Sequence, residues 1–312
     1  MKKVIKLLLL MVVCLSTISL IGCVYTPSKK VSVIVPTGTP SLGIANVLND
    51  ETLVDANIVS GSDGLVAAFT NANYDIVVAP VNLGVKFYNS TENFEYVLYQ
   101  TIVWGNYFIA STENIVINSF TDLDNKTLLV FGKNSTPDVV VRTLINYYQI
   151  NVTLEYVDDV STANAYLKTG KADIIVSAEP ALTKFSGNAS YNRYDLQQEW
   201  AKVTGSYSFP QAGIFVKKSL KNDLDVQNVL KKMKASVLMA KTDPNTLIEK
   251  AVKVDSNLNK IGLETLQKAI PNCNLRLDEN QKEAIAYYCQ KVIDLGIGKT
   301  VGGKLPDEGF YY

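Results

Sequence analysis

Tyr74-Asp-Ile-Val-Val-Ala79 and Ala172-Asp-Ile-Ile-Val-Ser177 are near copies of one segment, about a hundred residues apart. Each contains a continuous run of β-branched residues, the pattern of a strand that is buried on both faces of a parallel sheet. Strand and helix signals follow in the same order around both copies. The repeat therefore predicts an α/β chain with two similar lobes.

The segment Tyr96–Ala110 is too long and too β-rich for an ordinary linker and is expected to cross between the lobes, and a second crossing is expected near Gly205–Val216. The region from Ser219 onward has mainly helical signals and should pack on the first lobe. We therefore expect two lobes, two inter-lobe crossings and a helical C-terminal region. The expected division is lobe I over residues 31–108 plus 208–312, and lobe II over residues 109–207.

The N-terminus is similar to that of a secreted bacterial lipoprotein. A basic start leads into a mainly apolar run over residues 7–21, which is short for a transmembrane helix. Leu20-Ile-Gly-Cys23 then resembles a lipobox, which implies cleavage before Cys23 and its acylation, for example with palmitate. We expect a signal peptide over 1–22 and a lipidated tether over 23–30. The alternative is a retained signal anchor with an incidental cysteine.

The composition excludes several classes of protein. The chain has 30 basic and 30 acidic residues, and removal of the signal peptide leaves a net charge near −3, which does not suit nucleic acid. It contains no histidine and no phosphate-loop or metal motif, so we expect no metal and no cofactor. Cys273 and Cys289 could form a disulfide or remain two separate buried thiols.

Several segments together resemble the substrate-binding lipoproteins of ABC importers, of the nitrate, sulfonate and thiamine-pyrimidine type. They are the lipobox, Gly38-Thr-Pro-Ser41, the two repeated strands, Gln211-Ala-Gly213 and the tail Gly302–Tyr312. The resemblance implies a type II periplasmic-binding-protein fold in a monomer on the extracytoplasmic face of the cell membrane. It also implies delivery of a small solute to an ABC permease with its ATPase, and no enzyme activity.

Ligands of open α/β sheets bind at the loops that follow the carboxyl ends of strands. This rule and the expected crossings place candidate ligand-binding residues at the cleft between the lobes. The candidates are Thr37, Gly38, Thr39, Ser41, Asn82, Trp104, Asn106, Asn134, Ser135, Thr136, Glu179 and Gln211.

Each class of candidate also has a structural alternative. Thr39-Pro-Ser41 and Ser135-Thr-Pro137 could each hold a ligand oxygen at a helix N-terminus, or simply cap that helix. Trp104 could stack on a flat ligand or fill the hinge, and Glu179 could pair with a ligand amine or cap the helix after it. Two helix N-termini without arginine, together with nearby aromatic residues, favour a small polar or heteroaromatic solute.

Two other functions are compatible with this fold class. One is an enzyme of the menaquinone-pathway dehydratase type, although the lack of histidine removes the commonest general base. The other is a surface receptor or adhesin that uses the fold without transport. A solute-binding lipoprotein of an importer is the interpretation that the sequence favours over both.

Overall fold

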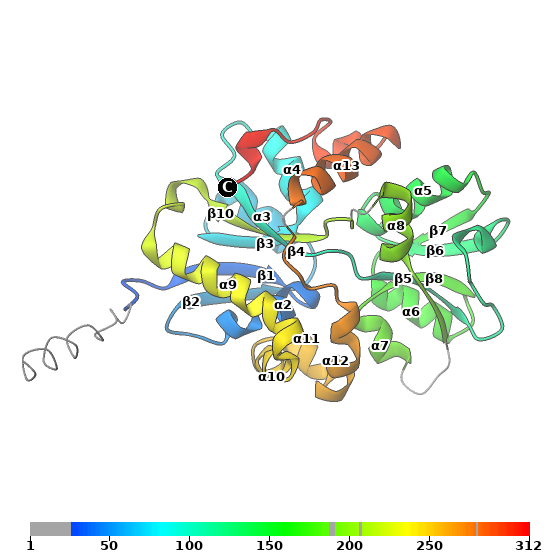
Figure 1. Ribbon diagram of the computed structural model, residues 1–312, viewed down its shortest axis with the longest axis horizontal. Helices are drawn as coiled ribbons and strands as arrows, with labels where there is room; N and C mark the ends of the chain where they lie inside the picture. Colours follow the sequence, from blue (N-terminus) through cyan, green and yellow to red (C-terminus); the bar gives the residue numbers. More distant parts are fainter. Residues whose placement is uncertain (1–25, 187–190, 206–207, 279) are drawn as a thin grey trace, which may run out of the picture.

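A computed structural model describes residues 26–186, 191–205, 208–278 and 280–312 (Figure 1). The predicted signal peptide and the predicted lipidation site at Cys23 lie outside the described residues. In the part of the chain that is described, no helix is long and apolar enough to cross a membrane.

The described residues form two five-stranded sheets with the same internal order. In each sheet three parallel strands are followed by one antiparallel strand, and the edge strand beyond it runs in the same direction as the first three. The first sheet contains β2 (Val54–Val59), β1 (Val31–Pro36), β3 (Ile76–Pro80), β10 (Ala212–Lys217) and β4 (Tyr96–Val103), in that order. The second contains β7 (Thr153–Val157), β6 (Thr127–Phe131), β8 (Ile174–Ala178), β5 (Tyr107–Thr112) and β9 (Tyr191–Asp195).

The repeated sequence segments occupy equivalent places, because β3 and β8 are the central strands of the two sheets. Both faces of β3 are buried: Ile76 and Val78 enter one core cluster, while Val77 and Ala79 enter another. This explains the continuous apolar run, since a strand covered on both sides has no solvent-facing positions. The two-lobed α/β fold predicted from the repeat is confirmed.

Helices cover both faces of each sheet. In the first lobe they are α2 (Thr39–Leu48), α3 (Asp63–Asn71) and α4 (Val81–Ser90), and in the second α5 (Thr136–Tyr148), α6 (Val160–Lys168), α7 (Ala181–Ser186) and α8 (Leu196–Thr204). The C-terminal region adds α9 (Leu224–Thr242), α10 (Pro244–Val254), α11 (Ser256–Ile261), α12 (Leu263–Ala269) and α13 (Gln281–Asp294). Short 3₁₀ turns are η1 (Phe120–Leu123), η2 (Lys218–Leu220), η3 (Ile270–Asn272), η4 (Gly298–Val301) and η5 (Glu308–Phe310).

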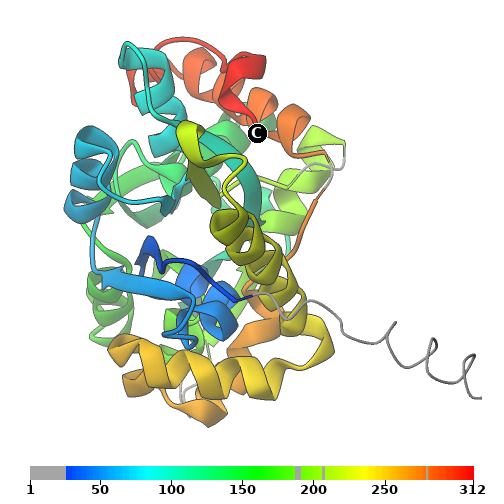
Figure 2. The same ribbon diagram turned by 90° about the vertical axis from the view of Figure 1, so that its left-hand side faces the viewer.

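The sequence suggested that all of the C-terminal helices pack on the first lobe, and the structure shows that this is wrong for α13. α9 and α10 pack on α2, and Figure 2 shows α9 lying across the side of that lobe. α13, however, also contacts α5 of the second lobe, where Arg142 Nη2 donates to the carbonyl of Leu295 at 3.3 Å. One apolar cluster therefore continues from the first lobe through α13 into the second.

The first crossing is short. β4 ends at Val103 and β5 begins at Tyr107, so Tyr107 and Phe108 belong to the second sheet and not to lobe I as expected. The C-terminal segment runs beside this crossing, where Trp104 N donates to the carbonyl of Asn274 at 3.2 Å. The second crossing leads from α8 to β10.

The disulfide considered for Cys273 and Cys289 does not form. Both cysteines are free and fully buried, and they lie in different apolar clusters. Burial raises the pKa of each thiol to about 12, because a buried thiolate would lose its hydration.

We expect both thiols to resist alkylation in the folded protein. At pH 8 iodoacetamide should leave Cys273 and Cys289 unmodified, because the reactive thiolate is scarce and the side chains are inaccessible. Both should react after unfolding in guanidinium without reductant. Peptide mass spectrometry gives the modification at each position, and a linked peptide pair in the unfolded sample would contradict the assignment of free thiols.

Gly84 should be intolerant of a side chain, because a Cβ there would lie 2.2 Å from the ring of Phe215. Gly84→Ala should lower the free energy of unfolding by about 1–3 kcal/mol in urea denaturation, since α4 packs directly on β10. Gly64→Ala is the control: its nearest contact is a side-chain atom of Val59 at 3.3 Å, and alanine favours helix. Equal losses in both variants would show that the close packing of α4 is unimportant.

Candidate functional site

A cleft of about 790 Å³ opens between the two lobes. The β1–α2 loop and α11 line it from one side, and α6 and the β8–α7 connection line it from the other. Asn106 and Gln211, which lie on the two crossings, also line this cleft. It therefore has the position expected for a ligand site at the carboxyl ends of the strands.

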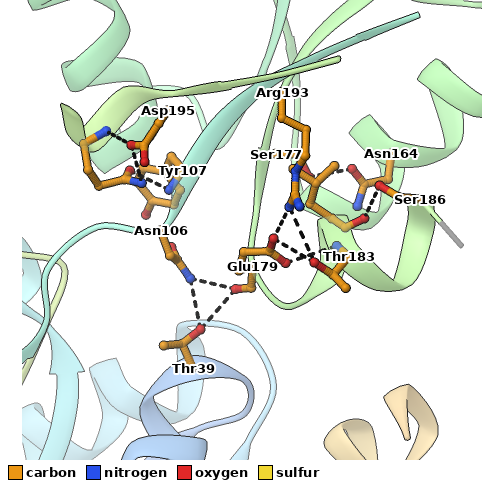
Figure 3. A network of polar contacts seen from close by, with 12 residues as sticks. Thr39, Asn106, Tyr107, Asn164, Ser177, Glu179, Thr183, Ser186, Arg193 and Asp195 are labelled. Atoms are coloured by element: carbon orange, nitrogen blue, oxygen red, sulfur yellow. Dashed lines mark hydrogen bonds and ion pairs between the residues drawn. The ribbon is translucent and has the colours of Figure 1, made fainter. Parts of the chain in front are cut away.

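A three-residue hydrogen-bonded bridge joins the lobes in this cleft (Figure 3). Asn106 Nδ2 donates to Thr39 Oγ1 at 2.9 Å and to the carbonyl of Glu179 at 2.6 Å. Thr39 Oγ1 in turn donates to the same carbonyl at 3.0 Å. A carbonyl can only accept, so the amide nitrogen of Asn106 must face Glu179. The side-chain oxygen of Asn106 therefore points elsewhere.

That oxygen belongs to a group of buried polar atoms with no protein partner. Among the described residues these atoms include Asn82 Oδ1, Trp104 Nε1, Asn106 Oδ1 and Gln211 Oε1. Ala212 of β10 pairs with both Pro80 of β3 and Val103 of β4. Asn82, Trp104 and Gln211 each lie one or two residues from these paired positions. Neighbouring strands are about 4.8 Å apart, so the backbones of these three residues lie near the same end of the first sheet.

The β1–α2 loop is held in place by one buried carboxylate, Asp255. It accepts from Thr37 Oγ1 at 2.8 Å, from Ser41 Oγ at 2.6 Å and from the N–H of Gly38 at 3.3 Å. It also caps α11 by accepting from the N–H groups of Asn257 and Leu258. Thr37 and Ser41 therefore orient the loop through Asp255, and the Ser41 side chain does not line the cleft.

The Glu179 carboxylate is already engaged within the second lobe. It accepts from Thr183 N at 3.0 Å and from Thr183 Oγ1 at 2.8 Å, and it forms an ion pair with Arg193 (Figure 3). The capping alternative for Glu179 is thus realised. What Glu179 contributes to the inter-lobe bridge is its backbone carbonyl.

Three exposed lysines line the cleft from three different helices: Lys168 on α6, Lys184 on α7 and Lys260 on α11. Among the described residues none of them has an ion-pair partner within 4.0 Å. Because Arg193 pairs with Glu179, the charged side chains that line the cleft leave an excess of positive charge, which favours a negatively charged group.

The aromatic surface of the cleft differs from the expected one. Trp104 is fully buried beneath Arg276 and does not line the cleft, so the hinge-packing alternative describes it. Tyr107 and Phe131 line the cleft instead, and Tyr107 stacks on Phe209 with ring centroids 5.4 Å apart. Burial raises the pKa of Tyr107 far above its ordinary value, which keeps the phenol neutral.

The predicted residues of the second helix N-terminus also lie away from the cleft. Asn134 N donates to Asp138 at 2.8 Å, Ser135 Oγ donates to the carbonyl of Gly132, and Thr136 contacts Tyr288 of α13. The reason is that α13 packs against α5 and covers its N-terminal end. In the second lobe α6 and α7 line the cleft instead, and the sequence could have indicated α6 because it follows β7.

Of the twelve candidates, six line the cleft: Thr37, Gly38, Thr39, Asn106, Glu179 and Gln211. Asn82 and Trp104 do not line the cleft, although each has a buried polar atom without a protein partner. The contribution of α11 was missed, since no local pattern in a C-terminal helix indicates that it returns to the cleft.

A family profile described as "Menaquinone biosynthesis" matches residues 108–293, more than half of the chain. The chain belongs to this family. The matched part of this Menaquinone biosynthesis family member contains the second sheet except for Tyr107, and most of the C-terminal helices. No curated protein sequence matches the chain.

Solved structures with the same fold include proteins described as components of ABC transporters or import systems. A structure described as an ABC transporter from Parabacteroides distasonis is 21% identical, with a TM-score of 0.75 over 91% of this chain and 98% of the other. The aliphatic sulphonate binding protein SsuA of Escherichia coli is 13% identical, with a TM-score of 0.68 over 90% and 91%. A ligand-binding component of an import system from Staphylococcus aureus is 11% identical, with a TM-score of 0.66 over 91% and 96%. The periplasmic-binding-protein fold implied by the sequence resemblance is confirmed for this family member.

Asp255 should be important for the stability of the cleft loop. Asp255→Ala should lower the free energy of unfolding by about 2–4 kcal/mol, because the hydroxyls of Thr37 and Ser41 and the N-terminal N–H groups of α11 lose this acceptor. Asp243→Ala removes only a cap from α10 and should cost about 1 kcal/mol. Urea denaturation measures both, and a similar loss in the two variants would contradict the role of Asp255 in holding the loop.

Proposed function

We propose that this protein is a solute-binding lipoprotein of an ABC importer, anchored to the extracytoplasmic face of the cell membrane. The observation that carries the proposal is the inter-lobe cleft, where two residues that line it, Asn106 and Gln211, each have a buried side-chain oxygen without a protein partner. Buried polar atoms are normally hydrogen-bonded, so such atoms facing a cleft are candidates for contact with a ligand. The ligand is a small polar solute, and the three lysines favour one with a negative charge.

The mechanism follows from elements that both lobes contribute. A solute in the cleft contacts the β1–α2 loop and α11 of one lobe and α6 and the β8–α7 connection of the other. It therefore stabilises the closed arrangement, in which Thr39 and Asn106 bind the carbonyl of Glu179. The permease then recognises the closed form. The two crossings act as the hinge in a monomer.

Family membership gives a specific reason to keep an enzyme as the second candidate. The second lobe and C-terminal helices match a family described by menaquinone biosynthesis. The cleft, however, offers little acid–base chemistry: Glu179 is paired with Arg193, Tyr107 stays neutral, and the chain has no histidine. A binding role uses every feature of the cleft, whereas catalysis would require a base that these residues do not provide.

Native mass spectrometry of the full chain, expressed in a bacterial host and purified in mild detergent, tests the proposal. We expect a retained small molecule that is released unchanged, and an acylated N-terminal peptide that begins at Cys23. A retained molecule that is converted to a product of different mass during incubation would favour the enzyme. An unacylated Cys23 with a retained solute would overturn only the lipid anchor.

A further inference from the structure

The unpaired atoms beside the cleft define the hydrogen-bonding character of the missing partner. Asn106 is 2% exposed, and both of its amide hydrogens are used by Thr39 and Glu179. Only its carbonyl oxygen is left unsatisfied, and that oxygen is an acceptor. Whatever completes this site must therefore donate a hydrogen bond to Asn106.

Gln211 extends the same argument along the cleft. Its Oε1 atom is buried without a protein partner, while its backbone is fixed by bonds to Val103 and Val81. No hydrogen bond to a described residue holds its amide in one orientation, so the group can turn to match a ligand. Asn106 therefore sets the requirement for a donor, and Gln211 can accept from or donate to the same ligand according to its orientation.

Other polar groups at the bridge do not supply donors to a ligand. The carbonyl of Glu179 already accepts two hydrogen bonds, and the Thr39 hydroxyl donates its hydrogen to that carbonyl. The lysines that line the cleft are exposed, unlike Asn106. At the bridge the group left without a partner is thus an acceptor, Asn106 Oδ1, and the lysines lie at exposed positions of the helices.

We propose that the solute carries an N–H group, as in an amide, an imide or a ring N–H, which donates to Asn106 Oδ1. The inference rests on the proposed solute-binding function and specifies the class of solute. A donor-free oxyanion such as a sulfonate presents only acceptor oxygens, so it would leave Asn106 Oδ1 without a hydrogen-bond donor. Such a mismatch weakens binding by about ten- to a hundredfold.

Matched pairs of probes test the requirement for a donor. Isothermal titration of the full chain in detergent compares uracil with 1,3-dimethyluracil, nicotinamide with N,N-dimethylnicotinamide, and both with ethanesulfonate. We expect an N–H probe to bind at least tenfold more tightly than its methylated partner. Equal binding within each pair, or tighter binding of ethanesulfonate, would overturn the inference.

The co-purified solute provides a second, independent measurement. Its mass in heavy water counts exchangeable hydrogens, and we expect at least one on nitrogen after its structure is assigned. A retained solute without N–H groups would overturn this inference and leave the solute-binding function standing. If nothing is retained and no probe binds, the proposed function fails, and this inference fails with it.

A pair of variants separates a ligand contact from an ordinary buried polar atom. Gln211→Met removes one unpaired oxygen at the cleft. It should weaken the binding of uracil or nicotinamide, whichever binds the unaltered protein, at least tenfold without lowering the Tm of the free protein. Thr143→Val is the matched control, since Thr143 Oγ1 on α5 is also buried and unpaired but lies away from the cleft. It should leave binding unchanged. Unaltered binding by Gln211→Met would overturn the role assigned to Gln211.

Discussion

The arrangement of the two lobes depends on the hydrogen bonds that the side-chain amide of Asn106 donates. Asn106 lies on the first crossing and binds Thr39 of one lobe and Glu179 of the other at the same time. Gly105 permits this geometry, because a Cβ there would lie 2.5 Å from the ring of Phe209. The crossing is further held by Tyr107 N, which donates to Gln197 at 2.7 Å. A polar bridge at the hinge thus closes the lobes without filling the cleft.

The two lobes share a strand order but have different roles at the cleft. In the first lobe the loop before α2 faces the cleft and is oriented by Asp255. In the second lobe the corresponding end of α5 is covered by α13, and α6 takes its place. A repeated topology therefore gives an asymmetric site, because α13 covers the N-terminal end of α5 whereas the loop before α2 remains at the cleft.

The chemistry of the cleft favours recognition over reaction. Its carboxylate is neutralised by Arg193, its buried tyrosine stays protonated, and its unpaired amides can only exchange hydrogen bonds. The chain belongs to a family described by menaquinone biosynthesis, and it shares its fold with binding proteins of importers. The fold supports both functions, so the residues at the cleft have to decide between them.

The sequence by itself determined the two-lobed α/β fold, because the buried strands Ile76–Pro80 and Ile174–Ala178 keep their apolar pattern whatever surrounds them. It also indicated Thr39, Asn106 and Gln211, since the ends of strands and the crossings follow from local pattern. Only the tertiary structure decided that Trp104 is buried, that α13 covers Thr136, and that Asp255 and α11 reach the cleft. These facts depend on contacts between segments far apart in the chain, and local sequence patterns carry no information about such contacts.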